Sequence, residues 1–199
     1  MKFSELREAV CQANKEIGRT GLAKLTWGNA SAVDRQAGVM AIKPSGVDYA
    51  DLKPADIVIV ALALGLVLDG KLRPSSDTPT HLYLYRSFDA IGGIVHTHSH
   101  HATVWAQAER DLPCFGTTHS DHFYGAVPCT RRMTRAEIAK DYELNTGKVI
   151  VERFKRGKID PAQVPAVLVA NHAPFVWGPD IAHALENAIV LEEVAHMAA

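Results

Sequence analysis

The chain has 199 residues and a formal net charge of −1, with 47% hydrophobic and 22% charged residues. A chain of this length and balance suits one soluble domain with a substantial core. Its near-neutral charge argues against a nucleic-acid or membrane partner, so we expect neither.

The cysteines and the amino terminus indicate a cytoplasmic protein. Cys11, Cys114 and Cys129 are odd in number and form no CxxC pair, which argues against a disulfide framework. The first eight residues carry charges where a signal peptide would be apolar. The longest apolar run, 57–68, is shorter than the roughly 20 residues of a membrane-spanning helix.

Hydrophobic periodicity predicts interleaved helices and strands. Apolar residues at helical spacing predict a first helix over 4–18, with Ser4 as its cap. The other expected helices are 78–88, 101–108, 143–156 and 180–197, and the expected strands are 38–43, 56–61, 66–69, 93–98, 126–129 and 166–170. Several strand connections are typical of hairpins, so we expect an α/β fold in which helices cover a mixed, largely antiparallel sheet.

Four of the ten histidines lie at positions 96–101, directly after an apolar run. If residues 94–98 form a strand, His96 and His98 project from the same face and offer two metal ligands. The alternative is that they are ordinary polar residues at a strand end. His172 also follows an expected strand; alone it would be an ordinary loop histidine, but with the pair it completes a three-nitrogen set typical of a catalytic metal site.

Other residues could complete such a site. Asp77 is a candidate carboxylate ligand, although Asp before Thr-Pro is equally a good helix cap. Three turns could bind a phosphate through backbone amides and hydroxyls, and Lys43 precedes one of them, although each could be only a turn and Lys43 a surface residue. These turns are Gly28-Asn29, Ser45-Gly46 and Ser75-Ser76.

The polar loop 116–125 packs titratable groups among aromatic residues. A carboxyl group there could take part in proton transfer. The alternative is a hydrogen-bonded loop that His119 and His122 merely support.

Taken together, six stretches resemble the class II aldolase superfamily and, within it, the L-ribulose-5-phosphate 4-epimerases. The resemblance runs from end to end of the chain and rests on 26–29, 42–47, 73–81, 92–102, 116–125 and 165–178. It implies a single domain with a three-layer α/β/α class II aldolase-like fold. The sugar aldolases of the superfamily resemble the chain less well, because they carry Glu where this chain has Asp77 and lack the pattern at 118–121.

The resemblance also implies roles for particular residues. His96, His98, His172 and Asp77 would bind a divalent metal, zinc first, with manganese or cobalt as alternatives. The three turns and Lys43 would bind a sugar phosphate, and Asp121 would donate and accept a proton in a site between subunits of a homotetramer.

The implied reaction inverts carbon 4 of L-ribulose 5-phosphate by retro-aldol cleavage and re-addition. The epimerases use a second acid/base group, a carboxyl-terminal tyrosine that no residue of 1–199 matches, so we expect a further tail; the alternative is a protein that works without this tyrosine. The alternatives are a related sugar-phosphate aldolase and, because the fold also serves cytoskeletal head domains without the metal site, a non-catalytic interaction domain.

Overall fold

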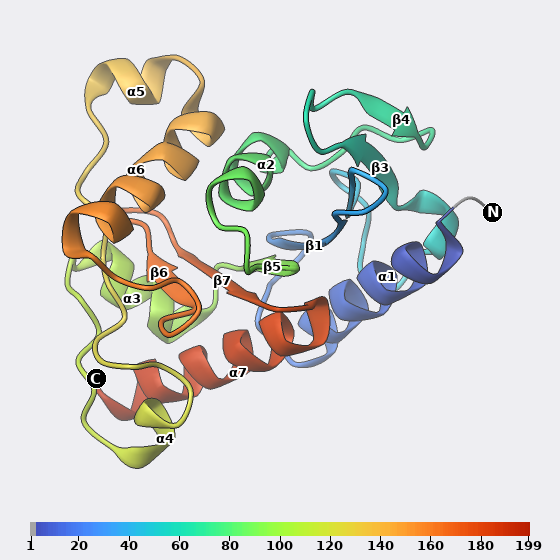
Figure 1. The fold of residues 1–199 in the computed structure, drawn as a ribbon. Coiled ribbons are helices and arrows are strands. Elements are labelled where there is room, and N and C mark those ends of the chain that lie inside the picture. Colours follow the sequence, from blue (N-terminus) through green and yellow to red (C-terminus); the bar gives the residue numbers. More distant parts are fainter. Residues whose placement is uncertain (1–2) are drawn as a thin grey trace.

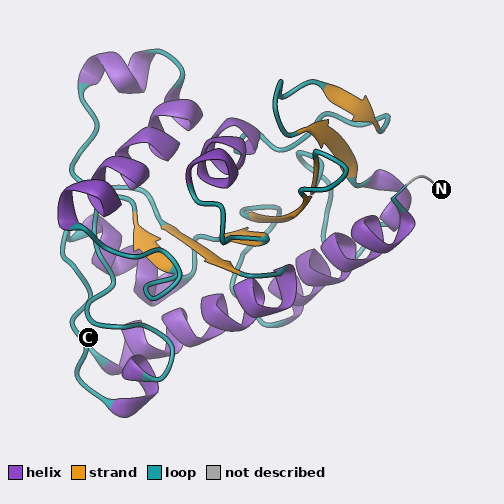
Figure 2. Cartoon of the chain, viewed as in Figure 1, coloured by secondary structure: helices purple, strands orange, loops and turns teal. Residues whose placement is uncertain are grey.

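A computed structural model describes residues 3–199, and its helices and strands form three layers (Figures 1 and 2). Seven strands form one sheet in the order β4-β3-β2-β1-β5-β7-β6. They are β1 (Asn29–Asp34), β2 (Val39–Ile42), β3 (Val58–Ala61), β4 (Val67–Asp69), β5 (Gly93–His96), β6 (Ala166–Leu168) and β7 (Pro174–Gly178). Every pair of neighbouring strands is antiparallel.

These strands confirm the expected α/β class and the largely antiparallel sheet. The sheet is less mixed than expected, because the one parallel pairing among the described residues is an isolated bridge between Cys129 and Leu168.

Helices cover both faces of the sheet. They are α1 (Ser4–Arg19), α2 (Thr78–Ser87), α3 (His100–Gln107), α4 (Thr117–Ser120), α5 (Arg135–Ala139), α6 (Tyr142–Gly157) and α7 (Ile181–Met197), with a 3-10 turn at Pro54–Asp56. Helices α1, α3 and α7 share one buried core with the sheet, and α2 and α6 share the other. In β2, Val39 and Ala41 belong to the first core while Met40 and Ile42 belong to the second, as the alternation of side chains along a strand requires.

Several local features of the structure differ from the sequence predictions. Helix α1 begins at Ser4 itself after a left-handed Phe3, so Ser4 is not its cap. The expected strand at 126–129 forms only isolated bridges, β5 already ends at His96, and neither α5 nor β7 was predicted. Strand β7 was not predicted because its apolar run begins at a proline and lacks an alternation of polar and apolar residues. That alternation is absent because both faces of the strand are buried.

Two contacts fix the central strands β1 and β5 against the helices. The buried Asn14 side chain of α1 donates to Ala30 O at 3.1 Å and accepts from Ala30 N at 2.8 Å. At Gly93 a Cβ would lie 2.5 Å from the Cα of Ile181, so the start of α7 can cross β5 only over a glycine. Both strands lead to the candidate site, and these contacts therefore set its position.

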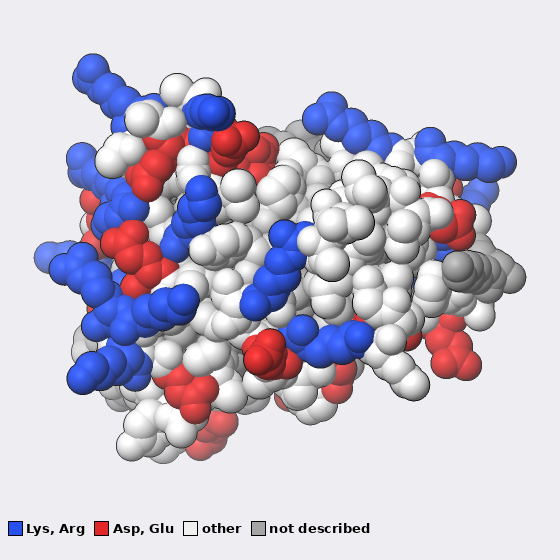
Figure 3. Space-filling view, turned by 45° about the horizontal axis from the view of Figure 1, so that its top comes forward, with Lys and Arg blue, Asp and Glu red and all other residues white. Residues whose placement is uncertain are grey.

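The surface carries charged residues of both signs (Figure 3). On the face drawn in Figure 3, Lys and Arg lie among Asp and Glu, with uncharged residues between them. No helix in the described part of the chain has both the length and the apolar character needed to cross a bilayer.

Candidate metal centre

Three histidines converge at one edge of the sheet. Strands β5 and β6 both pair antiparallel with β7, so they run in the same direction and end at the same edge. His96 is the last residue of β5, His98 lies in the loop before α3, and His172 lies in the turn between β6 and β7. The three rings offer nitrogens that all lie within 4.8 Å of one another. The predicted set therefore comes together, although His98 reaches it from beyond the strand.

Hydrogen bonds on the far side of two rings orient them. His96 Nδ1 lies 2.9 Å from Pro174 O, and its ring stacks on Phe175 with centroids 4.0 Å apart. A carbonyl can only accept, so Nδ1 carries the proton and Nε2 keeps its lone pair. His172 Nδ1 lies 3.2 Å from the Tyr142 hydroxyl, which can donate to or accept from that nitrogen. Such outer contacts fix the tautomer and angle of metal-binding histidines.

The surroundings keep the three imidazoles neutral. Burial lowers the pKa of His96 to about 3, and the neighbouring His98 adds to the shift. Burial also lowers the pKa of His172 to about 3, with His96 and His98 contributing, and it lowers the pKa of His98. Three neutral rings with converging lone pairs form a donor set that fits a divalent cation and leaves room for a further ligand.

Asp77 lies beside the histidines, but it is not one of the three converging donors. It stands directly before α2, yet its side chain makes no cap bond to that helix. Instead its Oδ2 accepts from Asn29 Nδ2 at 2.7 Å, and the same amide donates to Ser75 Oγ at 3.1 Å. The structure thus does not use Asp77 as a side-chain helix cap, and its role as a metal ligand stays a prediction.

The candidate phosphate turns and the histidines line one cavity of about 380 Å³. Of the predicted site residues, its lining includes Gly28, Asn29, Lys43, Ser45, Gly46, Ser75, Ser76, Asp77, His96, His98 and His172. Two of the turns pair through backbone bonds, from Ser45 N to Arg73 O at 2.9 Å and from Ser75 N to Lys43 O at 3.0 Å.

Gly28 is required where its turn meets β5. Its φ is +87°, and a Cβ there would lie 2.5 Å from His96 O. The Tyr49 hydroxyl donates to the carbonyls of Trp27 and Gly28, at 2.6 and 2.9 Å, and holds the turn in place. Any side chain at Gly28 would therefore displace the backbone of His96.

Lys43 is buried, not on the surface. Its Nζ donates to Val47 O at 2.6 Å and lies 5.0 Å from the centre of the Tyr49 ring. Burial lowers its pKa to about 8, and Asp48 opposes the shift. The ammonium therefore still carries its charge at neutral pH, in a poorly solvated position beside the cavity.

The structure does not bring Asp121 to this cavity within one chain. Asp121 is exposed and follows α4, which packs against α7 (Figure 1). Conversely, Tyr142 and Glu143 at the start of α6 do line the cavity, and sequence reasoning missed both. No local pattern could have found them, because a tyrosine and a glutamate at a helix start are common surface residues.

The fold and this donor set define an α/β protein in which three histidines that could hold a metal ion line the same cavity as the candidate phosphate turns. Residues 8–199 match the family model described as the Class II Aldolase and Adducin N-terminal domain, and the chain belongs to that family.

Solved structures agree with this assignment. A structure named L-fuculose 1-phosphate aldolase is 29% identical, with a TM-score of 0.83 over 99% of this chain and 86% of that one. YgbL from Escherichia coli, described as a putative aldolase/epimerase/decarboxylase, is 26% identical, with a TM-score of 0.77 over 98% of this chain and 88% of that one. An L-fuculose-1-phosphate aldolase from Thermus thermophilus is 23% identical, with a TM-score of 0.75 over 97% of this chain and 93% of that one, and shares the fold.

Proposed function

We propose that the chain is a metal-dependent L-ribulose-5-phosphate 4-epimerase, which converts its substrate to D-xylulose 5-phosphate. The observation that carries the proposal is the carboxylate beside the histidines. Asp77 is shorter than the Glu of the sugar aldolases, and its Oδ2 is occupied by the Asn29 amide. A carboxylate held in this way is suited to binding or orienting the cation and less suited to removing a proton from carbon.

The reaction calls for cleavage and not simple deprotonation, because carbon 4 of the substrate is not acidic. The C4 hydroxyl gives up its proton, the C3–C4 bond breaks, and its electron pair passes to the carbonyl. A divalent ion held by the three histidines, when bound, would stabilise the negative charge on that carbonyl oxygen. Rotation of the aldehyde and re-addition on its other face then restore the bond with carbon 4 inverted.

The chain's own groups hold the substrate during these steps. The turns at 28–29, 45–46 and 75–76 present backbone amides and hydroxyls to the phosphate, with the Lys43 charge beside them. They would hold glycolaldehyde phosphate, the fragment that carries carbons 4 and 5, by its phosphate while its aldehyde group turns. Retention of both fragments is what separates an epimerase from an aldolase.

Asp121 would move the hydroxyl proton, and it must do so in another copy of the chain. It does not line the cavity of its own chain, so our proposal places each active site between subunits of a homotetramer. Two inactive variants test this. In a mixture of His96→Asn and Asp121→Asn chains, refolded together, some sites combine an intact histidine set with an intact Asp121. We expect activity to return, whereas an inactive mixture would contradict a site shared between subunits.

The direct test is turnover of L-ribulose 5-phosphate by metal-loaded protein, followed by enzymatic detection of D-xylulose 5-phosphate. Metal content is assayed in the same sample. Protein that holds about one metal per chain but forms no xylulose phosphate would refute the proposal.

A second candidate, a sugar-phosphate aldolase, has a specific observation in its favour. The 29% identical structure is named L-fuculose 1-phosphate aldolase. Assay with L-fuculose 1-phosphate separates the two activities, because an aldolase would cleave it to dihydroxyacetone phosphate and free lactaldehyde.

A further inference from the structure

We infer that Tyr142 is a positioning residue of the metal centre, and that its hydroxyl holds the His172 ring at the angle the centre requires. The inference rests on the metal site of the proposed function, but not on any particular substrate. It adds a residue from α6, in the layer of helices opposite α1 and α7, to a site otherwise built from turns and strand ends.

The contact itself resembles the one that fixes His96. The Tyr142 hydroxyl lies 3.2 Å from His172 Nδ1, and the ring centroids are 5.9 Å apart. His96 has the Pro174 carbonyl on its Nδ1 and Phe175 stacked against its face. His172 lies in a turn with Asn171 at a φ of +60°, and among the described residues only Tyr142 hydrogen-bonds its ring. Without that bond nothing polar in the described part of the chain fixes the ring's rotation.

The bond has a defined direction once a cation is bound. When Nε2 gives its lone pair to the metal, Nδ1 keeps its proton and donates it to the phenol oxygen of Tyr142. A donor–acceptor pair of this kind raises the basicity of the ligating nitrogen and selects one tautomer. Phenylalanine could fill the same space but could not accept that proton.

The turn before Tyr142 is braced, as a positioning role requires. Asp141 adopts a left-handed conformation with a φ of +55°. The Asn145 side chain donates to Glu137 O at 3.0 Å and to Lys140 O at 2.8 Å, and so closes the turn.

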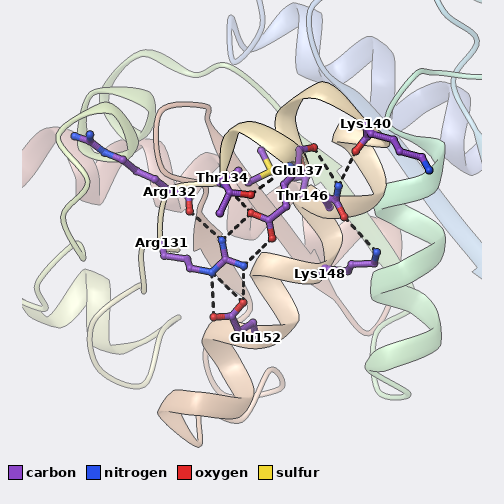
Figure 4. Close-up of polar contacts among 10 residues, drawn as sticks. Arg131, Arg132, Thr134, Glu137, Lys140, Thr146, Lys148 and Glu152 are labelled. Carbon is purple, nitrogen blue, oxygen red and sulfur yellow. Dashed lines mark hydrogen bonds and ion pairs between the residues drawn. The ribbon is translucent and has the colours of Figure 1, made fainter.

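Two further contacts anchor α5 and the start of α6. Arg131 bonds the carboxylates of both Glu137 in α5 and Glu152 in α6 (Figure 4). Thr80 of α2 donates to Glu143 O at 2.5 Å, which fixes the residue next to Tyr142. Tyr142 thus projects from a braced helix start towards the turn that carries His172.

The test is metal affinity in the absence of substrate. Apo protein is titrated with Co²⁺ and Zn²⁺ against a chromophoric chelator, for the wild type and for Tyr142→Phe. We expect the variant to bind each metal 10- to 100-fold more weakly, as is usual when an outer partner of a ligand is removed. We also expect the visible Co²⁺ spectrum to change, because the ligand field changes with the His172 ring angle.

Tyr83→Phe is the matched control. Tyr83 of α2 lies against Gly147 of α6, the helix that carries Tyr142, but it does not line the cavity. Tyr83→Phe also removes one phenol oxygen, but it should leave metal affinity and the Co²⁺ spectrum unchanged. Urea unfolding of the apo proteins shows whether either variant alters stability. Affinity of Tyr142→Phe within twofold of the wild type, with an unchanged spectrum, would overturn the inference.

This outcome is distinct from failure of the proposed function. A wild type that binds metal but does not turn over L-ribulose 5-phosphate refutes the epimerase and leaves the role of Tyr142 open to the same titration. A Tyr142→Phe protein that binds metal normally refutes the positioning role and leaves the epimerase in place.

Discussion

Acidification from pH 7.5 to 5.5 should destabilise the metal-free protein strongly, because buried histidines resist protonation. Burial lowers the pKa of both His81 and His96 from the ordinary 6.5 to about 3, and it does the same for His172. Between pH 6.5 and 3 the unfolded chain therefore binds protons that the folded chain does not. Stability rises with pH wherever the unfolded state holds more protons, so it must fall as the pH drops through this window.

The magnitude follows from the number of withheld protons. Each one lowers the free energy of unfolding by about 1.4 kcal/mol per pH unit below 6.5. The fully buried pair His81 and His96 gives roughly 3 kcal/mol at pH 5.5, and His172 raises the loss to roughly 4 kcal/mol. A total stability of about 5–15 kcal/mol makes this a large fraction. The exposed His183 has the opposite sign, because Asp180 raises its pKa.

The assay is urea unfolding at a series of pH values from 7.5 to 5, at fixed ionic strength and with chelator present. His96→Asn removes one withheld proton, so its slope should be shallower by about 1.4 kcal/mol per pH unit. The control His183→Gln should fall at least as steeply as the wild type. A wild-type loss below about 1.4 kcal/mol per pH unit, or an unchanged slope in His96→Asn, would refute the reasoning.

Three further predictions concern single substitutions. Asp121→Asn should leave metal affinity unchanged and lower the epimerisation rate; a fall of less than about tenfold in a steady-state assay contradicts an acid/base role. Gly28→Ala should cost about 1–2 kcal/mol from its left-handed backbone alone and should also weaken Zn²⁺ binding through His96 O, which urea unfolding and chelator competition measure. Asn14→Ala should lower the free energy of unfolding by about 2–4 kcal/mol, because it leaves Ala30 N and O buried without their side-chain partner; a loss below about 1 kcal/mol would show that the contact matters little.

Periodicity and turn residues were enough to predict much of the fold. The helix at α1 and the hairpin around Gly65 were located because their patterns are local. The edge at which the histidines meet was also predictable in outline, since His96 and His172 each follow an apolar run. What the sequence could not show is that β7 lies between β5 and β6 and makes those two strands run in the same direction. That relation depends on pairing between distant segments.

The burial of Lys43 also could not be predicted from the sequence. A lone lysine before a turn is usually a solvated residue, and that alternative stood beside the phosphate role. The structure removes the surface alternative, since the side chain is buried with its ammonium on Val47 O. Its contacts to Val47 and Tyr49 are close in sequence, but Tyr49 is itself held by the carbonyls of Trp27 and Gly28, and a local pattern does not encode that pairing of distant segments.

The contact between Tyr142 and His172 joins a helix to the sheet, and it too could not be predicted from the sequence. The three histidines come from the sheet edge, where local patterns give some warning, but the group on His172 comes from α6 across the boundary between layers. Its approach depends on the left-handed Asp141, on the Asn145 amide and on the Arg131 ion pairs that join α5 to α6. By our inference, helix α5, which the sequence did not predict, helps to hold Tyr142 against His172. Substitutions in that exposed helix should therefore lower metal affinity by displacing Tyr142, although none of its residues lines the cavity.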